Sequence, residues 1–218
     1  MLDIILPLSC AGCGRAGCEL CDDCLRGLQR LLGPCCARCG APSAWPVARC
    51  LECKGRKLAF TCARAAVAYL GPAKQLVRAW KDGGRRRLAA LAARLVAEVV
   101  ARPTVDAVTF VPADPDRGLR RGRHPARELA ALLAVQWELP CLATLERREP
   151  APRQRGLTLA ERRRNVRGAY RARAPTPRRL ALIDDVYTTG ATANACASVL
   201  RASGARSVEV ITFARAVR

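Results

Sequence analysis

The sequence is poor in aromatic residues and has a single histidine, and both shortages limit its chemistry. Phe, Trp and Tyr make up only 4% of the 218 residues, although half of the chain is hydrophobic. A core built from this chain must therefore consist mainly of Ala, Leu and Val. The one histidine, His124, excludes a Ser–His or Cys–His catalytic pair anywhere else. Because Pro125 follows it, we expect His124 to cap a helix or face solvent rather than act as a general base.

Long apolar runs are also missing. The longest, 88-LAALAARLVAEVVA-101, contains Arg94 and Glu98 and is too short to cross a bilayer, so no integral membrane segment is expected. The first ten residues, MLDIILPLSC, lack the basic start and the apolar length of a signal peptide. We therefore expect a cytoplasmic protein whose first residues form a short amphipathic segment.

Acidic residues are few relative to basic ones. The chain has 38 Lys and Arg against 18 Asp and Glu, which gives a formal charge of +20, and only four of the basic residues are Lys. Such a charge favours polyanions, which include nucleic acid, phosphorylated metabolites and anionic membrane surfaces. A GC-rich genome that encodes Arg wherever a basic residue would serve is an equally good explanation of the total, but it does not explain local clusters such as 117-RGLRRGR-123.

Cysteine is abundant, and eleven of the thirteen cysteines lie within residues 10–62. They include four Cys-x-x-Cys pairs, and two such pairs supply the four thiolates of a tetrahedral zinc site. Disulfides would require an oxidising compartment, and a redox site would need only one pair. We expect two structural zinc ions; sequential pairing is the simplest arrangement, and interleaved pairing stays open. The expected ligands are Cys10, Cys13, Cys21, Cys24, Cys36, Cys39, Cys50 and Cys53. Cys35 is an alternative to Cys36, and we expect Cys141 and Cys196 to be buried packing residues.

Composition divides the chain near residue 60. Residues 1–60 are punctuated by Pro and Gly and show little apolar periodicity, which indicates a small metal-held module. Residues 61–218 alternate between strand-like and helix-like segments and predict an α/β domain with a mostly parallel sheet flanked by helices. Strands are expected at 62–70, 106–112, 180–184 and 207–215, and helices at 72–80, 88–101, 125–137 and 191–203. The Arg-rich segment 142–173 is expected to be a long loop.

The stretch 182-LIDDVYTTGAT-192 places two acids at the carboxyl end of a buried strand, directly before a small-residue turn and a helix. Free amides and the dipole at a helix start favour a phosphate, and Gly190 permits its close approach. Asp184 and Asp185 would repel that phosphate unless they hold a sugar diol or a magnesium ion. The combination predicts a site for a phosphorylated ribose. The structural alternative is a helix start capped by Thr with acids favoured by the dipole.

This stretch resembles the phosphoribosyl pyrophosphate (PRPP) signature of type I phosphoribosyltransferases. The wider chain resembles the ComF-type competence proteins, which are amidophosphoribosyltransferase-like. The likeness includes the Cys-x-x-Cys pairs and the segments 78-RAWKDGG-84, 110-FVPADPDRGLRRGR-123 and 161-ERRRNVRGAY-170. The resemblance implies a type I phosphoribosyltransferase fold preceded by a small double zinc-ribbon module, in which four cysteines hold each zinc ion.

The resemblance also implies roles for individual residues. Asp184 and Asp185 would contact the ribose hydroxyls, directly or through magnesium, and the loop 153–168 would form a hood over the site. The implied 5-phosphate cradle consists of Thr188, Thr189, Gly190, Ala191 and Thr192. The implied pyrophosphate partners are Arg117, Arg120, Arg121 and Lys81, and the catalytic set would be Asp184, Asp185, Lys81 and Arg117.

Two hypotheses about function follow. The first is a magnesium-dependent phosphoribosyltransferase that binds PRPP, with an unidentified acceptor, linked to DNA uptake and natural transformation or to nucleotide metabolism. The alternative is a non-catalytic accessory protein of DNA uptake or recombination that binds single-stranded DNA and other DNA-uptake proteins. The acid pair favours the first. The run 121-RGRHPA-126 favours binding without turnover, because the family commonly has Arg-Gly-Phe-Asn-Gln there, and Asp114 and Asp116 add negative charge nearby.

Overall fold

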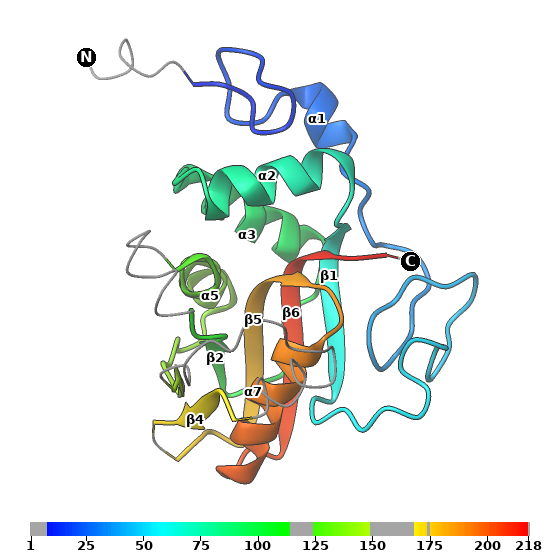
Figure 1. The fold of residues 1–218 in the computed structure, drawn as a ribbon, viewed down its shortest axis with the longest axis vertical. Coiled ribbons are helices and arrows are strands. Elements are labelled where there is room, and N and C mark those ends of the chain that lie inside the picture. Colours follow the sequence, from blue (N-terminus) through cyan, green and yellow to red (C-terminus); the bar gives the residue numbers. More distant parts are fainter. Residues whose placement is uncertain (1–7, 114–123, 149–167, 174, 218) are drawn as a thin grey trace, which may run out of the picture.

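The computed structural model describes residues 8–113, 124–148, 168–173 and 175–217, and its centre is a four-stranded parallel sheet (Figure 1). The strand order is β1-β6-β5-β2, so the last strand of the chain lies inside the sheet. The strands are β1 (Cys62–Ala68), β2 (Ala107–Phe110), β5 (Arg179–Tyr187) and β6 (Ser207–Arg215). The predicted alternation of strands and helices around a parallel sheet is confirmed.

Helices cover both faces of this sheet (Figure 1). On one face lie α2 (Gly71–Lys81), α3 (Arg87–Val99) and α5 (Pro125–Trp137), and α7 (Ala191–Ala202) lies on the other. The first face is a core of Ala, Leu and Val side chains around the buried Trp80 and Trp137. The shortage of aromatic residues is therefore met by small aliphatic side chains, which let the helices approach the sheet closely.

Three local predictions differ from the structure. β5 extends to Tyr187, three residues beyond the predicted end at Asp184, so Asp185 also lies within the strand. The segment expected to be one long loop contains β3 (Leu145–Arg147) and β4 (Tyr170–Ala172), which pair antiparallel, so the loop prediction is wrong at its two ends. Arg171 and Arg173 of this region form ion pairs with Glu146, and such charged pairs hide a short strand from apolar patterning. Cys196 is buried as expected, whereas Cys141 is exposed.

Residues 8–61 consist of turns, isolated bridges and the short helix α1 (Asp22–Arg26). Part of this segment shares a core with the sheet and α7: Cys36, Cys39 and Phe60 pack in the same cluster as Tyr187 and Cys196. Gly40 makes this contact possible, because a Cβ there would lie 2.3 Å from the carbonyl oxygen of Ala63. The division of the chain into 1–60 and 61–218 stays a prediction. None of the helices in the described residues is both long and apolar enough to span a bilayer.

Candidate anion site and cysteine clusters

The acid pair lies near the carboxyl end of β5 and is held by backbone and side-chain hydrogen bonds. The amide of Asp185 donates to Asp184 over 2.9 Å, and the amide of Val186 donates to Asp185 over 2.8 Å. Asp185 is buried, and Asp184 is half-buried. Lys81, the last residue of α2, donates to the second Asp185 oxygen over 2.5 Å. The structure therefore brings together three of the residues singled out in the sequence, and Lys81 ends α2 one residue beyond the helix predicted at 72–80.

The environment changes the pKa values of Asp184 and Lys81 by different mechanisms. Burial raises the pKa of Asp184 well above its ordinary value, and the neighbouring Asp185 carboxylate raises it further. Burial alone lowers the pKa of Lys81, but the Asp185 carboxylate outweighs burial, and the net effect is a raised pKa. Lys81 thus stays an ammonium group and neutralises Asp185. The Asp184 carboxylate pays a desolvation cost, which a bound divalent cation would relieve.

The Thr188–Thr192 loop joins β5 to α7 through a tight turn at Gly190. Gly190 has φ 71° and is the N-cap of α7, and a Cβ at this position would lie 2.2 Å from the Tyr187 hydroxyl. Only glycine meets both demands without a shift in the backbone or in Tyr187. The N-cap Gly190 has no side chain that could cap α7, but the amide of Ala191, the first residue of the helix, donates to Thr189 Oγ1 over 3.3 Å. The start of this 12-residue helix still directs its dipole and the amides after Ala191 toward an anion.

One cavity of about 390 Å³ joins the acid pair to this loop. Thr188 and Thr192 line it together with Lys81 and both acids. Gly190 and Ala191 line a smaller cavity of about 20 Å³ that also contacts Asp184, whereas Thr189 lines neither. The remaining residues that line the large cavity are Tyr69, Val77, Val111, Pro112, Ala113, His124, Pro125, Ala126, Arg147, Tyr170 and Val186.

Several cavity residues were not singled out in the sequence. Tyr69 follows β1, and Tyr170 and Arg147 belong to the β3–β4 pair, so only the tertiary fold brings them to the acids. His124 caps α5 as expected: its Nδ1 accepts from the amide of Arg127 over 3.1 Å. Burial lowers the pKa of His124.

The predicted pyrophosphate partners Arg117, Arg120 and Arg121 lie outside the described residues. So do Asp114 and Asp116, and so does nearly all of the loop predicted to form a hood, residues 153–167.

The eight expected zinc ligands form two groups of four, paired sequentially. Cys10, Cys13, Cys21 and Cys24 form the first cysteine cluster, and Cys36, Cys39, Cys50 and Cys53 form the second. Within each cluster all Sγ atoms lie within 4.8 Å of one another, and all thirteen cysteines of the chain are free thiols. Hydrogen-bonding Sγ pairs are 3.4–3.9 Å apart. Four thiolates at ~2.3 Å from one zinc ion are about 3.8 Å apart, so both clusters fit a structural zinc ion.

Backbone amides support thiolates in both clusters. Gly12 and Cys21 each donate to Cys10 Sγ over 3.3 Å, and Cys50 donates to Cys36 Sγ over 3.3 Å. Burial raises the pKa of Cys10 and Cys36, but the backbone amides around each sulfur outweigh burial and lower the pKa to about 6. The thiolate is the form that binds metal, so these amides favour the ligand form of Cys10 and Cys36, whereas burial raises the pKa of Cys24, Cys39 and Cys53.

Comparison with known proteins gives relatives along most of the chain. No family model matches the sequence. The chain is 29% identical over 209 residues to competence protein F of Haemophilus influenzae, covering 90% of both chains. It is also 29% identical over 208 residues to DNA utilization protein YhgH of Salmonella typhi, again covering 90% of both. Among solved structures, orotate phosphoribosyltransferase from Aeropyrum pernix aligns over 68% of this chain and 67% of its own, with 22% identity and a TM-score of 0.37.

Proposed function

Because the chain is a homologue of competence protein F and DNA utilization protein YhgH, as its sequence indicated, we propose that it binds PRPP with magnesium, in a role linked to DNA uptake or nucleotide metabolism. One observation carries the proposal. Lys81, Asp184, Asp185, Thr188 and Thr192 line a single cavity of about 390 Å³ at the carboxyl edge of a parallel sheet. This edge is where parallel α/β sheets bind ligands.

Each part of the cavity suits one part of PRPP. The Thr188–Thr192 loop and the start of α7 would hold the 5-phosphate with backbone amides and Thr hydroxyls. Asp184 and Asp185 would face the ribose hydroxyls, and magnesium would neutralise the pyrophosphate and the Asp184 carboxylate together. Lys81 balances the charge of the Asp185 carboxylate, so the site carries less net negative charge toward an anionic ligand.

Transferase activity is the proposed reaction of this site. The bond between ribose C1 and the pyrophosphate oxygen would break while C1 bonds to a nucleophilic atom of the acceptor, which loses its proton. Negative charge then grows on the departing pyrophosphate, and magnesium and basic side chains stabilise it. We further propose that each cysteine cluster holds one zinc ion through its four thiolates. We also propose that the protein works in the cytoplasm, where thiols stay reduced.

A calorimetric titration tests the PRPP site. Wild-type protein carrying zinc is titrated with PRPP in the presence of magnesium, alongside the double variant Asp184→Asn/Asp185→Asn. We expect binding by the wild type, and a loss of at least about tenfold in affinity in the double variant, because magnesium loses its carboxylate ligands. Absence of binding by folded, zinc-loaded wild type contradicts the proposal.

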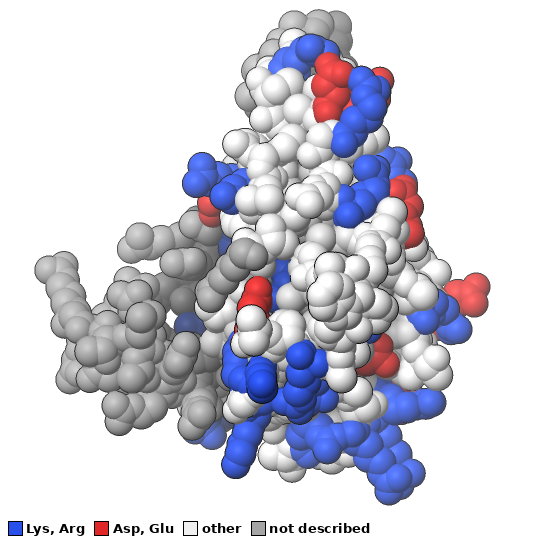
Figure 2. Space-filling model, turned by 90° about the vertical axis from the view of Figure 1, so that its right-hand side faces the viewer, with Lys and Arg blue, Asp and Glu red and all other residues white. Residues whose placement is uncertain are grey.

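Binding of single-stranded DNA is the second candidate function, and an Arg-lined groove at the opposite end of the sheet favours it. The groove encloses about 560 Å³ between the residues before β1 and the end of α7, and Arg38, Arg201 and Arg206 line it. Figure 2 shows Lys and Arg side chains gathering at the lower end of the molecule, where α7 ends and β6 begins. Affinity for an oligonucleotide should fall steeply with salt, and Arg201→Ala/Arg206→Ala should reduce that slope by up to about two. An unchanged slope excludes this groove as the DNA site.

A further inference from the structure

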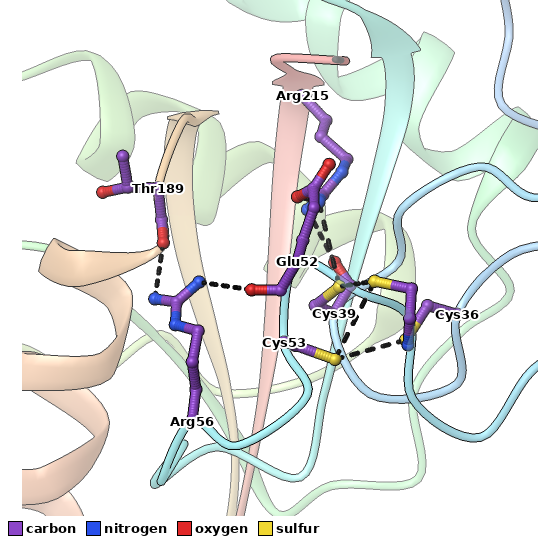
Figure 3. Close-up of polar contacts among 8 residues, drawn as sticks. Cys36, Cys39, Glu52, Cys53, Arg56, Thr189 and Arg215 are labelled. Atoms are coloured by element: carbon purple, nitrogen blue, oxygen red, sulfur yellow. Dashed lines mark hydrogen bonds and ion pairs between the residues drawn. The ribbon is translucent and has the colours of Figure 1, made fainter.

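The second cysteine cluster contacts the Thr188–Thr192 loop through a short chain of polar residues (Figure 3). Arg56 follows the Cys50–Cys53 turn, and its amide donates to the carbonyl of Cys53 over 3.1 Å. Its guanidinium donates to the carbonyl of Thr189 over 2.7 Å and lies 3.5 Å from the carbonyl of Glu52. One half-buried arginine thus ties the turn that holds two thiols to the middle of the candidate phosphate loop.

A second path runs through Arg215, the last residue of β6. Its side chain is 2% exposed, and it donates to the carbonyl of Cys39 and to the carboxylate of Glu52, both over 2.7 Å. The same guanidinium lies 4.6 Å from the centre of the Tyr187 ring, and Tyr187 in turn contacts Gly190. The cluster and the loop are therefore the two sides of one packed group, with Arg215 between them.

A third contact reaches the start of α7. The amide of Ala59 donates to the side chain of Asn194 over 2.7 Å, and the amide of Asn194 donates to the carbonyl of Gly190 over 2.9 Å. Segments on both sides of the loop are thereby fixed to residues 52–59. The affinity of a loop that binds an anion through its backbone amides depends on the direction of those amides. These contacts fix the backbone of the loop, so they influence its affinity for an anion.

We propose that the second cysteine cluster positions the Thr188–Thr192 loop for anion binding, with Arg56 and Arg215 as positioning residues. The cluster fixes the Cys50–Arg56 turn, Arg56 holds the Thr189 carbonyl, and Arg215 supports the ring beneath Gly190. The first cysteine cluster takes no part, since its neighbours are α2 and α3: Gly12 faces Pro72 of α2, and Arg87 of α3 lies 4.0 Å from the carboxylate of Glu19. This inference rests on the proposed function only for the identity of the anion.

The test compares Arg56→Ala with Lys57→Ala, a matched control that removes one positive charge from an adjacent exposed side chain. Hydrogen exchange of a peptide spanning residues 187–194 is measured without ligand, after zinc content and cooperative unfolding are checked. We expect exchange in this peptide to be about threefold to tenfold faster in Arg56→Ala than in the wild type, and unchanged in Lys57→Ala. Equal exchange in the two variants overturns the proposal.

A titration with ribose 5-phosphate adds a second readout. Arg56→Ala should bind it about threefold to tenfold more weakly, and Arg56→Lys should also bind more weakly, because an ammonium group cannot span the carbonyls of Glu52 and Thr189. Wild-type affinity in Arg56→Lys would mean that charge alone matters, which overturns the positioning role. If the wild type binds neither ribose 5-phosphate nor PRPP with magnesium, the proposed function fails, and the exchange rates alone decide the positioning role.

Discussion

The two cysteine clusters have the same ligand set and the same sequential pairing, but their surroundings differ. The cysteines of the first cluster pack with Cys18 and Leu20, and only neighbouring residues such as Ala11 and Leu28 reach the main core. The second contributes Cys36, Cys39 and Cys53 to a core that includes Tyr187, Cys196 and residues of β5 and β6. Identical local chemistry therefore has unlike consequences. A metal in the first cluster would hold a peripheral turn, whereas one in the second would complete the core beneath the candidate phosphate loop.

Substitution of two cysteines should give the largest difference in stability between the two clusters. Cys36→Ser/Cys53→Ser removes two buried ligands, and the binding free energy of a structural zinc ion, on the order of 10 kcal/mol, is also folding free energy. We expect this variant to lose about one zinc per chain and several kcal/mol of stability in the α/β part of the molecule, measured by metal analysis and urea unfolding.

The matched variant Cys10→Ser/Cys24→Ser also removes two buried ligands, but from the first cluster. It should lose the same amount of zinc, while the α/β part loses less stability than in Cys36→Ser/Cys53→Ser, because the cysteines of the first cluster lie outside the core against the sheet and only neighbours such as Ala11 and Leu28 reach it. Equal destabilisation by both variants would contradict the contrast between the clusters.

Arg215→Ala should cause the next largest loss of stability, and it affects the second cluster while leaving all of its cysteines in place. It leaves Glu52 and the carbonyl of Cys39 without the buried partner they have in the wild type. Removing one side of such a buried pair costs about 3–5 kcal/mol. The exposed Arg206, just before the same strand, is the control, and Arg206→Ala should change the free energy of unfolding by about 0.5 kcal/mol or less. Chemical denaturation of both variants measures the difference.

The smallest change in the free energy of unfolding is expected from Asp184→Asn, which should stabilise the protein rather than destabilise it. Since burial raises the pKa of Asp184 in the folded state, the native protein binds more protons than the unfolded chain above the ordinary pKa of 3.8. Stability is therefore lost as pH rises through the raised pKa. Asp184→Asn should increase stability, more at pH 8 than at pH 5, with zinc content unchanged, as measured by urea unfolding at both pH values.

The exposed Asp106 provides the contrast to Asp184. Hydrogen bonds from Arg179 lower the pKa of Asp106, so its contribution is present above the ordinary carboxyl pKa and is lost as pH falls through the lowered value. Asp106→Asn should therefore decrease stability at neutral pH, and a stabilising effect there would contradict the account of both carboxylates.

Features with a local signal could be predicted from the sequence. Cys-x-x-Cys pairs, apolar strands and a Thr-Thr-Gly turn each depend on neighbouring residues, and the structure places them much as expected. The contacts of Arg56 and Arg215 could not be predicted, because Arg56 meets Thr189 across 133 positions and Arg215 meets Glu52 across 163. Neither arginine differs in sequence from many others in an Arg-rich chain. Lys81 was singled out, but its pairing with Asp185 depends on how α2 packs.

The position of β6 inside the sheet has a consequence for the order of assembly. As the chain is synthesised, both cysteine clusters are complete long before β6 exists, so metal can be taken up early. The contact between Arg215 and the carbonyl of Cys39 spans 176 positions. β6 lies between β1 and β5, so these two strands cannot join one sheet until β6 has been synthesised. The second cluster is thus among the first parts to be made and among the last to be packed, which makes its docking a late and slow event in folding.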